Sequence, residues 1–408
     1  MPKYAIHLFM PATVLLLSAI LIALPSTGAA AGSPAAGSPG APIIPAPPQL
    51  AAEGYLLLDA DTGRVLVEHN SKQRLPPASL TKIMTSYVAA EEIERGTLTE
   101  TEEVDVSVKA WRMEGSRMFI QEGTKVSVDQ LLKGIIIQSG NDASVAMAEH
   151  IAGGEDAFAD VMNQHAMRLG MSDTNFKNAT GLPDEDHYTT ASDLAKLTIA
   201  LINRHPEHYK LYSEKSFRYN EINQSNRNKL LWADRSVDGV KTGHTEAAGY
   251  CLVASAVRNN MRLISVVMGT KSEKARATES QKLLSYGFRY FETVRLYDAR
   301  EILNTVRLWN AQVSSVSMGL GEAVVITLPR GSKGSLSATM DVESVILGPI
   351  SAGQALGQLT VSMGDNVVYE GPLIALADIP EAGFFKRMWH SLSLFALQLF
   401  GGDPLKIP

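Results

Sequence analysis

The sequence predicts an α+β fold: one antiparallel sheet flanked by helices, then a small all-β domain and a C-terminal amphipathic helix. Three observations predict it. Strand-like segments open the chain and return after a run of helical segments, the composition changes near residue 296 to short strands and turns, and the last segment repeats large apolar residues at helical spacing. At 408 residues, 45% hydrophobic and 20% charged, the chain is long enough for two globular domains.

The N-terminal segment, residues 1–31, is predicted to be a secretory signal peptide. Lys3 precedes a short apolar run, Thr13–Leu24, and small residues at Ala29 and Ala31 form an A-x-A cleavage site. The run is short for a membrane span of about 20 residues, and a retained membrane anchor is the alternative. Under either interpretation the bulk of the chain is exported.

Residues 32–50 are predicted to be a linker. The segment GSPAAGSPGAPIIPAPPQL is rich in Pro, Gly and Ala. A stretch of this composition buries too little apolar surface to offset the entropy of ordering it. We therefore expect a tether between the export signal and the first folded domain.

The first domain is expected to begin with a hairpin and to continue with helices. Residues 54–70 read as two short strands joined by a turn, and SLTKIMTSYVAAEEIERG places its apolar residues on one side of a helix that Gly96 ends. Ser127 and Gln130 form a capping box before an apolar helix, which ends in QSGND. Further helices are expected from Ala143 and over residues 155–169 and 192–203.

Three strands and a long helix follow. The strands are VDGVKTGHT, GYCLVASAVR and MRLISVVMGT, with a turn at Asn259 and Asn260 between the last two, and the helix closes near Phe291. Elements that neighbour each other in the chain tend to be neighbours in space, so the first hairpin and this late one are expected to share one sheet. The first domain is therefore predicted over residues 51–294.

A β-rich domain is predicted over residues 295–376. Its segments AVVITLPRGSKGSLSATMDV and LGQLTVSMGDNVVYEGPL alternate strands with turns. Because this domain contains no catalytic constellation, a spacer or docking role is the inference.

The last segment, residues 377–408, is predicted to be a membrane anchor. It carries an apolar stripe at helical spacing and basic residues on the other side: the stripe is Phe385, Met388, Leu392, Phe395 and Leu399, widened by Phe384, Trp389 and Phe400, and the basic side is Lys386, Arg387 and His390. Such a helix suits the plane of a membrane surface. A helix packed on the body of the protein produces the same stripe and is the alternative.

The net charge argues against a nucleic-acid-binding protein, and the pattern of His and Cys residues argues against a metal site. The net charge is −6 and the pI is near 5.9, so no broad basic surface is expected for nucleic acid. There is no His-Glu-x-x-His helix and no cysteine cluster, and His150 and His165 are expected to be surface or core fillers. The single cysteine, Cys251, is expected to be a buried strand residue.

The stretch PPASLTKIMT contains a possible nucleophile and base. If a helix begins at Ser79, Lys82 lies one turn on, on the same face, and the Ser79 Oγ lies near the positive end of the helix dipole. A neutral lysine can take the serine proton, and burial or a nearby cation lowers a lysine pKa toward that state. The pair alone is weak evidence, since roughly one or two Ser-x-x-Lys matches are expected by chance in a chain of this length.

Two further motifs make the signal specific. Ser139-Gly140-Asn141 follows between two helices, and Lys241-Thr242-Gly243 lies on a predicted strand. Ser-x-x-Lys, Ser-x-Asn and Lys-Thr-Gly in this order are the signature of penicillin-binding proteins and class A β-lactamases. The chain therefore resembles the serine penicillin-recognising peptidases, which implies the DD-peptidase/β-lactamase-like fold. The segments GVKTGHTEAAGYCLVASAVRNNMRLISVVMGT and ESQKLLSYGFRYFET look like the low-molecular-mass D-alanyl-D-alanine carboxypeptidases over nearly the whole mature chain.

The resemblance implies a role for each site residue. Ser79 is expected to be the nucleophile and Lys82 its base, with Ser139 relaying a proton. The other residues are expected to hold the substrate or to tune the base: Asn141 for the peptide, Lys241 for the neutrality of Lys82 and the terminal carboxylate, Thr242 and Arg276 for that carboxylate, Gly243 and Arg227 for substrate binding near the site, and the backbone N–H groups of Ser79 and His244 for the oxyanion. No cofactor or metal is expected.

The resemblance also implies a substrate and a location. The enzyme is expected to lie in the periplasm, attached to the outer face of the inner membrane, and to remove the terminal D-alanine from peptidoglycan stem peptides through an acyl-enzyme. β-Lactams are the expected covalent inhibitors. Three alternatives stay open: a β-lactamase, although the middle motif is Ser-Gly-Asn and not Ser-Asp-Asn; a transpeptidase, which shares the acyl-enzyme; and a non-catalytic envelope protein that binds stem peptides.

Overall fold

The computed structural model describes residues 44–407, so the predicted signal peptide lies outside the described residues. Residues 44–50, the end of the predicted linker, form no helix or strand. They nevertheless lie against the folded body: Ile44 and Leu50 pack on the hydrophobic core, and the Tyr286 hydroxyl donates a hydrogen bond of 3.0 Å to the Pro45 carbonyl.

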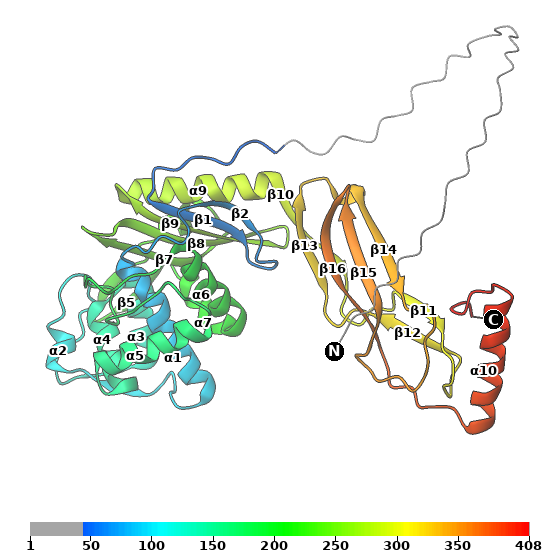
Figure 1. Cartoon of the computed structure of the whole chain (residues 1–408). Helices are drawn as coiled ribbons and strands as arrows, with labels where there is room; N and C mark the ends of the chain where they lie inside the picture. The colour runs from blue at the N-terminus through cyan, green and yellow to red at the C-terminus, as the bar shows by residue number, and fades with distance from the viewer. Residues whose placement is uncertain (1–43, 408) are drawn as a thin grey trace, which may run out of the picture. The chain divides into compact units, whose positions relative to one another are not determined.

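A five-stranded antiparallel sheet forms the centre of the first domain (Figure 1). Its order is β2-β1-β9-β8-β7, with bounds β1 (Gly54–Asp59), β2 (Val65–His69), β7 (Val237–Thr245), β8 (Gly249–Arg258) and β9 (Met261–Thr270). The prediction that the first and late hairpins share one sheet is confirmed, because β1 pairs along its length with β9. One consequence matters for the site: β7 is an edge strand.

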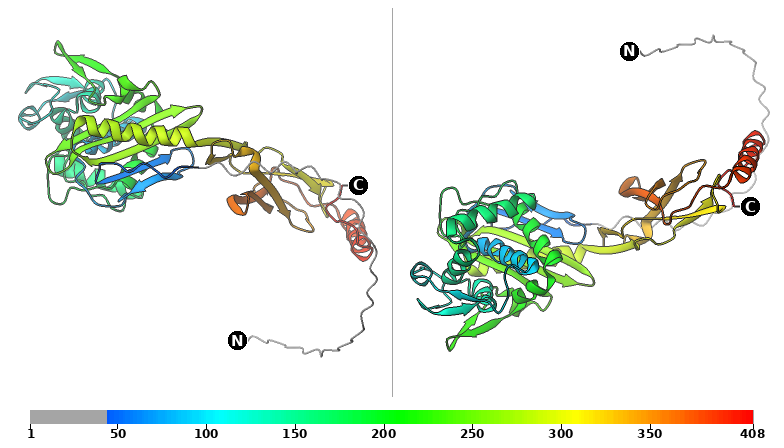
Figure 2. Two further views of the ribbon diagram at one scale, coloured as in Figure 1. Left: turned by 90° about the horizontal axis from the view of Figure 1, so that it is seen from above. Right: turned by 90° about the horizontal axis from the view of Figure 1, so that it is seen from below.

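Alternating side chains bury the two faces of this sheet. Leu57 packs with Leu283 and Leu284 of α9 (Glu273–Tyr290), which lies over one face (Figures 1 and 2). Leu56 and Leu58 point to the opposite face and pack with apolar side chains of α1 (Thr81–Arg95) and α6 (Ala191–Arg204). The strand period of two thus places a helical layer on each side.

The first domain contains further helices and two pairs of short strands. They are α2 (Val108–Trp111), α3 (Val128–Lys133), α4 (Asn141–Ala152), α5 (Glu155–Arg168), α7 (Pro206–Tyr209), α8 (Leu230–Ala233), the β3–β4 pair (Glu103–Asp105, Lys125–Ser127) and the β5–β6 pair (Ser216–Tyr219, Ile222–Ser225). The predicted cap at Ser127 is present, since its hydroxyl accepts a hydrogen bond from the Gln130 N–H at 3.3 Å.

The helix that begins near Ser79 differs slightly from the sequence prediction. A 3-10 turn, Ala78–Leu80, comes first, and α1 starts at Thr81 without a side-chain cap. Ser79 therefore lies in the turn that feeds the helix, and Lys82 is the second residue of α1. The helix ends at Gly96 as predicted, with φ of 76°.

The C-terminal part is all β and ends in a helix. A two-stranded pair, β10–β13, and a five-stranded antiparallel sheet, β11-β12-β16-β15-β14, enclose a core of their own. The bounds are β10 (Phe291–Tyr297), β11 (Asn304–Arg307), β12 (Ser315–Gly319), β13 (Val324–Pro329), β14 (Leu336–Val342), β15 (Ala355–Met363), β16 (Asn366–Ala375) and α10 (Phe384–Leu399). Among residues 44–407, none of the helices is both long and apolar enough to span a membrane.

Candidate active site

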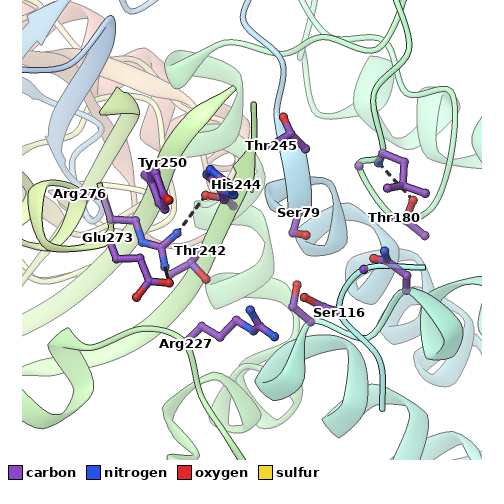
Figure 3. A pocket seen from close by; sticks show the side chains of 16 residues that line it. Ser79, Ser116, Thr180, Arg227, Thr242, His244, Thr245, Tyr250, Glu273 and Arg276 are labelled. Atoms are coloured by element: carbon purple, nitrogen blue, oxygen red, sulfur yellow. Dashed lines mark hydrogen bonds and ion pairs between the residues drawn. The ribbon is translucent and has the colours of Figure 1, made fainter. Parts of the chain in front are cut away.

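The three motifs meet around one cleft of about 450 Å³ (Figure 3). Ser79 comes from the turn before α1, Ser139 and Asn141 come from the junction before α4, and Thr242 to Thr245 come from the edge strand β7. Figure 3 shows Ser79 between the Arg276 and Thr180 sides of the cleft. Residues more than 160 positions apart in the chain are thus gathered at the exposed edge of the central sheet.

Lys82 is buried beside Ser79 and has three polar neighbours. Its Nζ lies 3.2 Å from the Ser79 Oγ. The same nitrogen donates hydrogen bonds to the Asn141 Oδ1 at 2.7 Å and to the Thr180 carbonyl at 2.6 Å. The Asn141 amide is held in this orientation because its Nδ2 donates to the Glu114 carbonyl at 2.6 Å. Lys82 is only 1% exposed, so its amine is isolated from bulk water.

Burial, followed by the positive charge of Arg227, lowers the pKa of Lys82 to about 7. The negative charges of Asp142 and Glu155 act in the opposite direction. Among the charged groups around Lys82, Arg227 has the largest effect on its pKa. Lys241 is itself buried, and burial followed by the charge of Lys82 lowers the Lys241 pKa well below its usual value. Because the repulsion between two ammonium groups is mutual, the buried Lys82–Lys241 pair favours the state in which only one of the two amines is protonated.

Ser139 occupies a special backbone position. A π-helical turn, Gly134–Gln138, precedes it, and Ser139 itself is left-handed, with φ of 65° and ψ of 37°. Its side chain lines the cleft, and within the described part of the chain its buried Oγ has no hydrogen-bond partner. A hydroxyl that is buried, unsatisfied and directed into a cleft is available to a bound molecule.

A segment that the sequence interpretation missed crosses the cleft beside Ser139. We call residues 114–120 the strap. The Asp142 carboxylate accepts hydrogen bonds from the strap N–H groups of Met118 and Phe119, each at 2.8 Å, and of Ile120 at 3.2 Å. The Asn141 N–H donates to the Ser116 carbonyl at 2.7 Å. Asp142 follows directly after the Ser-Gly-Asn motif at the start of α4, and that position was the only signal for it in the sequence.

Gly243 allows β7 to approach the turn that carries Ser79. A Cβ at this position would lie 2.9 Å from the Pro77 carbonyl oxygen and 3.3 Å from the Ala78 Cβ. Any larger residue would therefore separate the strand from the nucleophile. This close approach is the physical reason for the glycine in Lys-Thr-Gly.

Cationic and aromatic side chains form the far side of the cleft. Arg276 is buried, donates to the Gly243 carbonyl at 3.1 Å, and lies 5.6 Å from the centre of the Tyr250 ring. Arg227 is exposed, and its Nε donates to the Gln138 carbonyl at 3.2 Å. The His244 ring stacks on Tyr250 with 3.9 Å between the ring centres. Glu273 pairs with Arg276 at 3.7 Å, so the two guanidinium groups leave this side of the cleft with one net positive charge.

The structure brings all ten predicted site residues to this region. Eight of them line the cleft: Ser79, Ser139, Asn141, Arg227, Thr242, Gly243, His244 and Arg276. Lys82 and Lys241 are buried next to the cleft. Within the part of the chain that the structure describes, neither of them lines it. The sequence interpretation missed the other lining residues, which are Gly115, Ser116, Thr180, Gly181, Leu182, Thr245, Tyr250 and Glu273.

His150, His165 and Cys251 do not line this cleft in the part of the chain that the structure describes. Residues 44–407 contain no group of three His, Cys, Asp or Glu side chains arranged to hold a metal ion. His165 is buried against the Tyr87 ring, and His150 bonds to Glu102 at 2.9 Å. Cys251 is fully buried, and burial raises the pKa of its thiol to about 11.

Comparison with known proteins agrees with this geometry. The family model described as D-alanyl-D-alanine carboxypeptidase matches residues 41–272, and the model of the penicillin-binding protein 5 C-terminal domain matches residues 291–381. The D-alanyl-D-alanine carboxypeptidases DacC and DacA of Escherichia coli are 42% and 41% identical to the chain, over 87% and 88% of it and 90% and 91% of their own lengths.

Solved structures give the same result. Penicillin-binding protein 5 from Haemophilus influenzae has a TM-score of 0.78 and 40% identity, and the match covers 82% of this chain and 99% of that one. Penicillin-binding protein 6B from Escherichia coli has a TM-score of 0.71 and 38% identity, over 83% and 99% of the two chains. Fold and site thus define a penicillin-binding serine peptidase, and the chain belongs to the D-alanyl-D-alanine carboxypeptidase family. The resemblance inferred from the three motifs is confirmed.

Proposed function

We propose that Ser79 is the nucleophile of this serine-type D-Ala-D-Ala carboxypeptidase and that Lys82 is its base. One observation carries the proposal: the Lys82 Nζ lies 3.2 Å from the Ser79 Oγ, and burial lowers the Lys82 pKa to about 7. A lysine of ordinary pKa would be protonated at neutral pH and could not accept a proton. At this pKa about half of the molecules carry a neutral amine at pH 7.

The hydrogen bonds around Lys82 suit the neutral amine. Such an amine has two N–H groups and one lone pair. The two carbonyl oxygens, Asn141 Oδ1 and Thr180 O, accept the two N–H groups, and the lone pair is left for the Ser79 hydroxyl. The Ser79 proton then moves to Lys82 as the Oγ attacks the carbonyl carbon between the two D-alanines.

The substrate peptide binds along the free edge of β7. An edge strand presents unpaired N–H and C=O groups to an added chain. The terminal carboxylate lies at Thr242 and Arg276, with Arg227 supplying further positive charge. The backbone N–H groups of Ser79 and His244 donate to the oxyanion of the tetrahedral intermediate, an arrangement usually worth about 3–4 kcal/mol per donor.

Ser139 completes the proton path. Its unpartnered Oγ lines the cleft, so it is free to pass the proton from Lys82 to the departing D-alanine amine. Asn141 holds both Lys82 and the substrate peptide. Loss of D-alanine leaves an acyl-enzyme on Ser79, which water hydrolyses; no step requires a metal or cofactor.

Labelling with a radioactive penicillin, followed by peptide mapping, tests the nucleophile. The label is expected on the peptide that contains Ser79, and the Ser79→Ala variant is expected to fold normally but to release no D-alanine from a D-Ala-D-Ala peptide. Undiminished release by Ser79→Ala would refute the assignment. Slow loss of the label marks a peptidase, whereas rapid turnover marks a β-lactamase on the same scaffold.

We further propose that α10 attaches the enzyme to the outer face of the inner membrane, in the periplasm. Seven apolar side chains of α10 and the neighbouring Phe400 are between 51% and 85% exposed: Phe384, Phe385, Met388, Trp389, Leu392, Phe395, Leu399 and Phe400. Its polar side instead contacts the body of the protein, since the Lys386 Nζ donates to the Gln312 carbonyl at 2.8 Å and the His390 Nδ1 accepts from the Asn310 N–H at 2.9 Å. α10 has no buried residue, and a helix whose polar side contacts the protein while its apolar side is exposed is suited to a lipid surface.

The proposed division of the chain follows from these roles. Residues 1–31 are the signal peptide for export, and residues 32–50 are the linker to the first domain. Residues 51–294 form the peptidase domain, residues 295–376 form the β domain and residues 377–408 form the membrane anchor. The β domain would hold the active site away from the membrane, toward peptidoglycan, in cell-wall biogenesis and remodelling. Contiguity of the β domain with α10 along the chain supports this arrangement.

A further inference from the structure

One peptide group connects Lys82 to a side chain that the proposed catalytic steps do not use. The Thr180 carbonyl accepts a hydrogen bond from the Lys82 Nζ at 2.6 Å, and the Gly181 N–H of the same peptide group donates to the Asn178 Oδ1 at 2.7 Å. The C=O and N–H of a trans peptide group point in opposite directions. Lys82 and Asn178 are therefore bonded to the two opposite sides of the Thr180–Gly181 peptide group.

The Asn178 side chain organises the whole turn around Thr180. Its Oδ1 also accepts from the Thr180 N–H at 3.1 Å and from the Thr180 Oγ1 at 3.0 Å, and its Nδ2 donates to the Leu182 carbonyl at 3.0 Å. An asparagine that bonds to the backbone two residues further on forms an Asx turn. Because the same oxygen also accepts the Gly181 N–H, one amide orients the peptide groups on both sides of Thr180.

The orientation of this peptide group depends on such a restraint. Gly181 has a φ of 84°, and glycine allows backbone rotations that a side chain would hinder. The glycine is required by packing, since a Cβ at position 181 would overlap the Ala78 carbonyl. The chain thus has no side chain at position 181 to limit rotation, and the hydrogen bond from the Gly181 N–H to Asn178 supplies the restraint.

Rotation of the peptide group would change the direction of the Lys82 lone pair. A neutral amine has two N–H groups and one lone pair, and the Thr180 and Asn141 oxygens accept the two N–H groups. This leaves the lone pair for the Ser79 Oγ, 3.2 Å away. An amine that lost the Thr180 carbonyl would keep only the Asn141 acceptor and would turn about its C–N bond.

We propose that Asn178 is a positioning residue for acylation: through the Thr180–Gly181 peptide group it holds the carbonyl that directs the lone pair of Lys82 at Ser79. Asn178 acts through the backbone, and among the described residues it does not line the cleft. This role rests on the proposed function, because it requires Lys82 to be the base.

The pH profile of acylation by a penicillin, measured on the full chain by stopped flow between pH 5 and 9, tests this role. In Asn178→Ala the plateau of the second-order rate constant is expected to fall roughly ten- to hundredfold, the scale on which misplacing a reacting group slows a reaction. The midpoint of the profile is expected to move to lower pH, because the ammonium form of Lys82 loses a charge-assisted acceptor.

Two further variants separate positioning from folding. Asn178→Asp keeps an acceptor oxygen for the Thr180 and Gly181 donors, so its plateau is expected to stay within about threefold of the wild type, the scale of one lost hydrogen bond. Its added negative charge is expected to raise the midpoint. Asn178→Ser keeps a hydroxyl that can cap the Thr180 N–H but is too short for the Gly181 N–H, so it folds with a lowered plateau. If Asn178→Ala does not fold, a wild-type profile in Asn178→Ser would overturn the proposal.

Asn175→Ala is the matched control. Asn175 lies in the same segment, and its Nδ2 donates to the Asp186 carbonyl at 2.7 Å, away from the Thr180–Gly181 peptide group. Its loss is expected to lower the melting temperature and to leave plateau and midpoint unchanged. Asn178→Ala behaving like this control would reduce Asn178 to a structural residue while the carboxypeptidase assignment stands. A wild-type rate constant that does not change with pH would refute the base and the role of Asn178 together.

Discussion

At the residue scale, the chemistry depends on removing Lys82 from water. The same burial that isolates its amine lowers its pKa to about 7, and the amine remains hydrogen-bonded to two carbonyl oxygens. An exposed lysine at position 82 would sit near its usual pKa of about 10.4 and would be charged throughout the physiological range. Exclusion of solvent therefore allows the Lys82 amine, which would otherwise be protonated at neutral pH, to act as a base.

The lowered pKa of Lys82 predicts the pH dependence of acylation. The neutral amine predominates above pH 7, so the second-order rate constant for acylation by a penicillin is expected to rise about tenfold per pH unit below pH 6 and to level off above pH 8. Stopped-flow measurements between pH 5 and 9 give this profile. A rate constant that does not change over this range would contradict the role of Lys82 as the base.

At the element scale, the strap and the start of α4 act as one unit. The Asp142 carboxylate lies in the first turn of α4, where the helix dipole favours a negative charge, and it also accepts three N–H groups of the strap. Through these bonds α4 fixes the strap, whose Ser116 lines the cleft. Asp142 is a positioning residue, since it does not line the cleft formed by the described residues.

Replacing Asp142 by Asn is expected to loosen the strap. Because the amide has one acceptor oxygen where the carboxylate has two, at least one strap N–H loses its partner, which lowers the free energy of unfolding by about 1–3 kcal/mol. Acylation by penicillin is expected to slow, and its apparent pKa is expected to fall, because the negative charge of Asp142 that raises the Lys82 pKa is lost. Thermal unfolding and the pH profile of acylation measure the two effects.

The control for this variant is Asp129→Asn. Asp129 is likewise an acid in the first turn of a helix, α3, but its carboxylate pairs with Lys133 in a partly exposed position. Its replacement is expected to change the free energy of unfolding by about 0.5 kcal/mol or less and to leave acylation unchanged. Asp142→Asn behaving like this control would show that the strap is held by other contacts.

At the scale of the whole molecule, the amphipathic helix is separate from the site. Removing residues 384–408 is expected to release the protein from membranes, because the exposed apolar side of α10 is lost, and to leave D-alanine release from soluble peptides unchanged. Sedimentation with membrane vesicles, together with a peptide assay, measures both. Sedimentation of the truncated protein with vesicles would contradict the proposed anchor. The Lys386→Gln variant, which keeps the apolar stripe, is the control and is expected to stay bound.

The sequence predicted the architecture because its signals are local. The strands β7, β8 and β9 have the predicted bounds, and Asn259 and Asn260 adopt the positive φ values that a tight hairpin requires. The candidate catalytic residues could also be predicted from local signals, since the motifs that contain Ser79, Ser139 and Lys241 are short and follow one another in a fixed order along the chain.

Contacts made by the backbone could not be predicted in this way. The Thr180 carbonyl that accepts from Lys82 has no sequence signature, because every residue has a carbonyl. The attachment of the strap to Asp142 depends on how distant loops pack. The sequence also placed Ser79 inside the helix, although it lies in a 3-10 turn, since helix ends are set by tertiary contacts more than by propensity.

The left-handed backbone conformation of Ser139 lowers thermal stability, whereas the Ser139 side chain is needed for turnover. A side chain in this conformation costs roughly 1–2 kcal/mol, which glycine would avoid. Ser139→Gly is therefore expected to melt at a higher temperature and to turn over more slowly, as differential scanning calorimetry and a D-alanine assay would show. Directed evolution that selects for thermostability alone would therefore favour glycine at position 139 and lose the activity. A selection for a more stable variant of this protein has to measure D-alanine release as well.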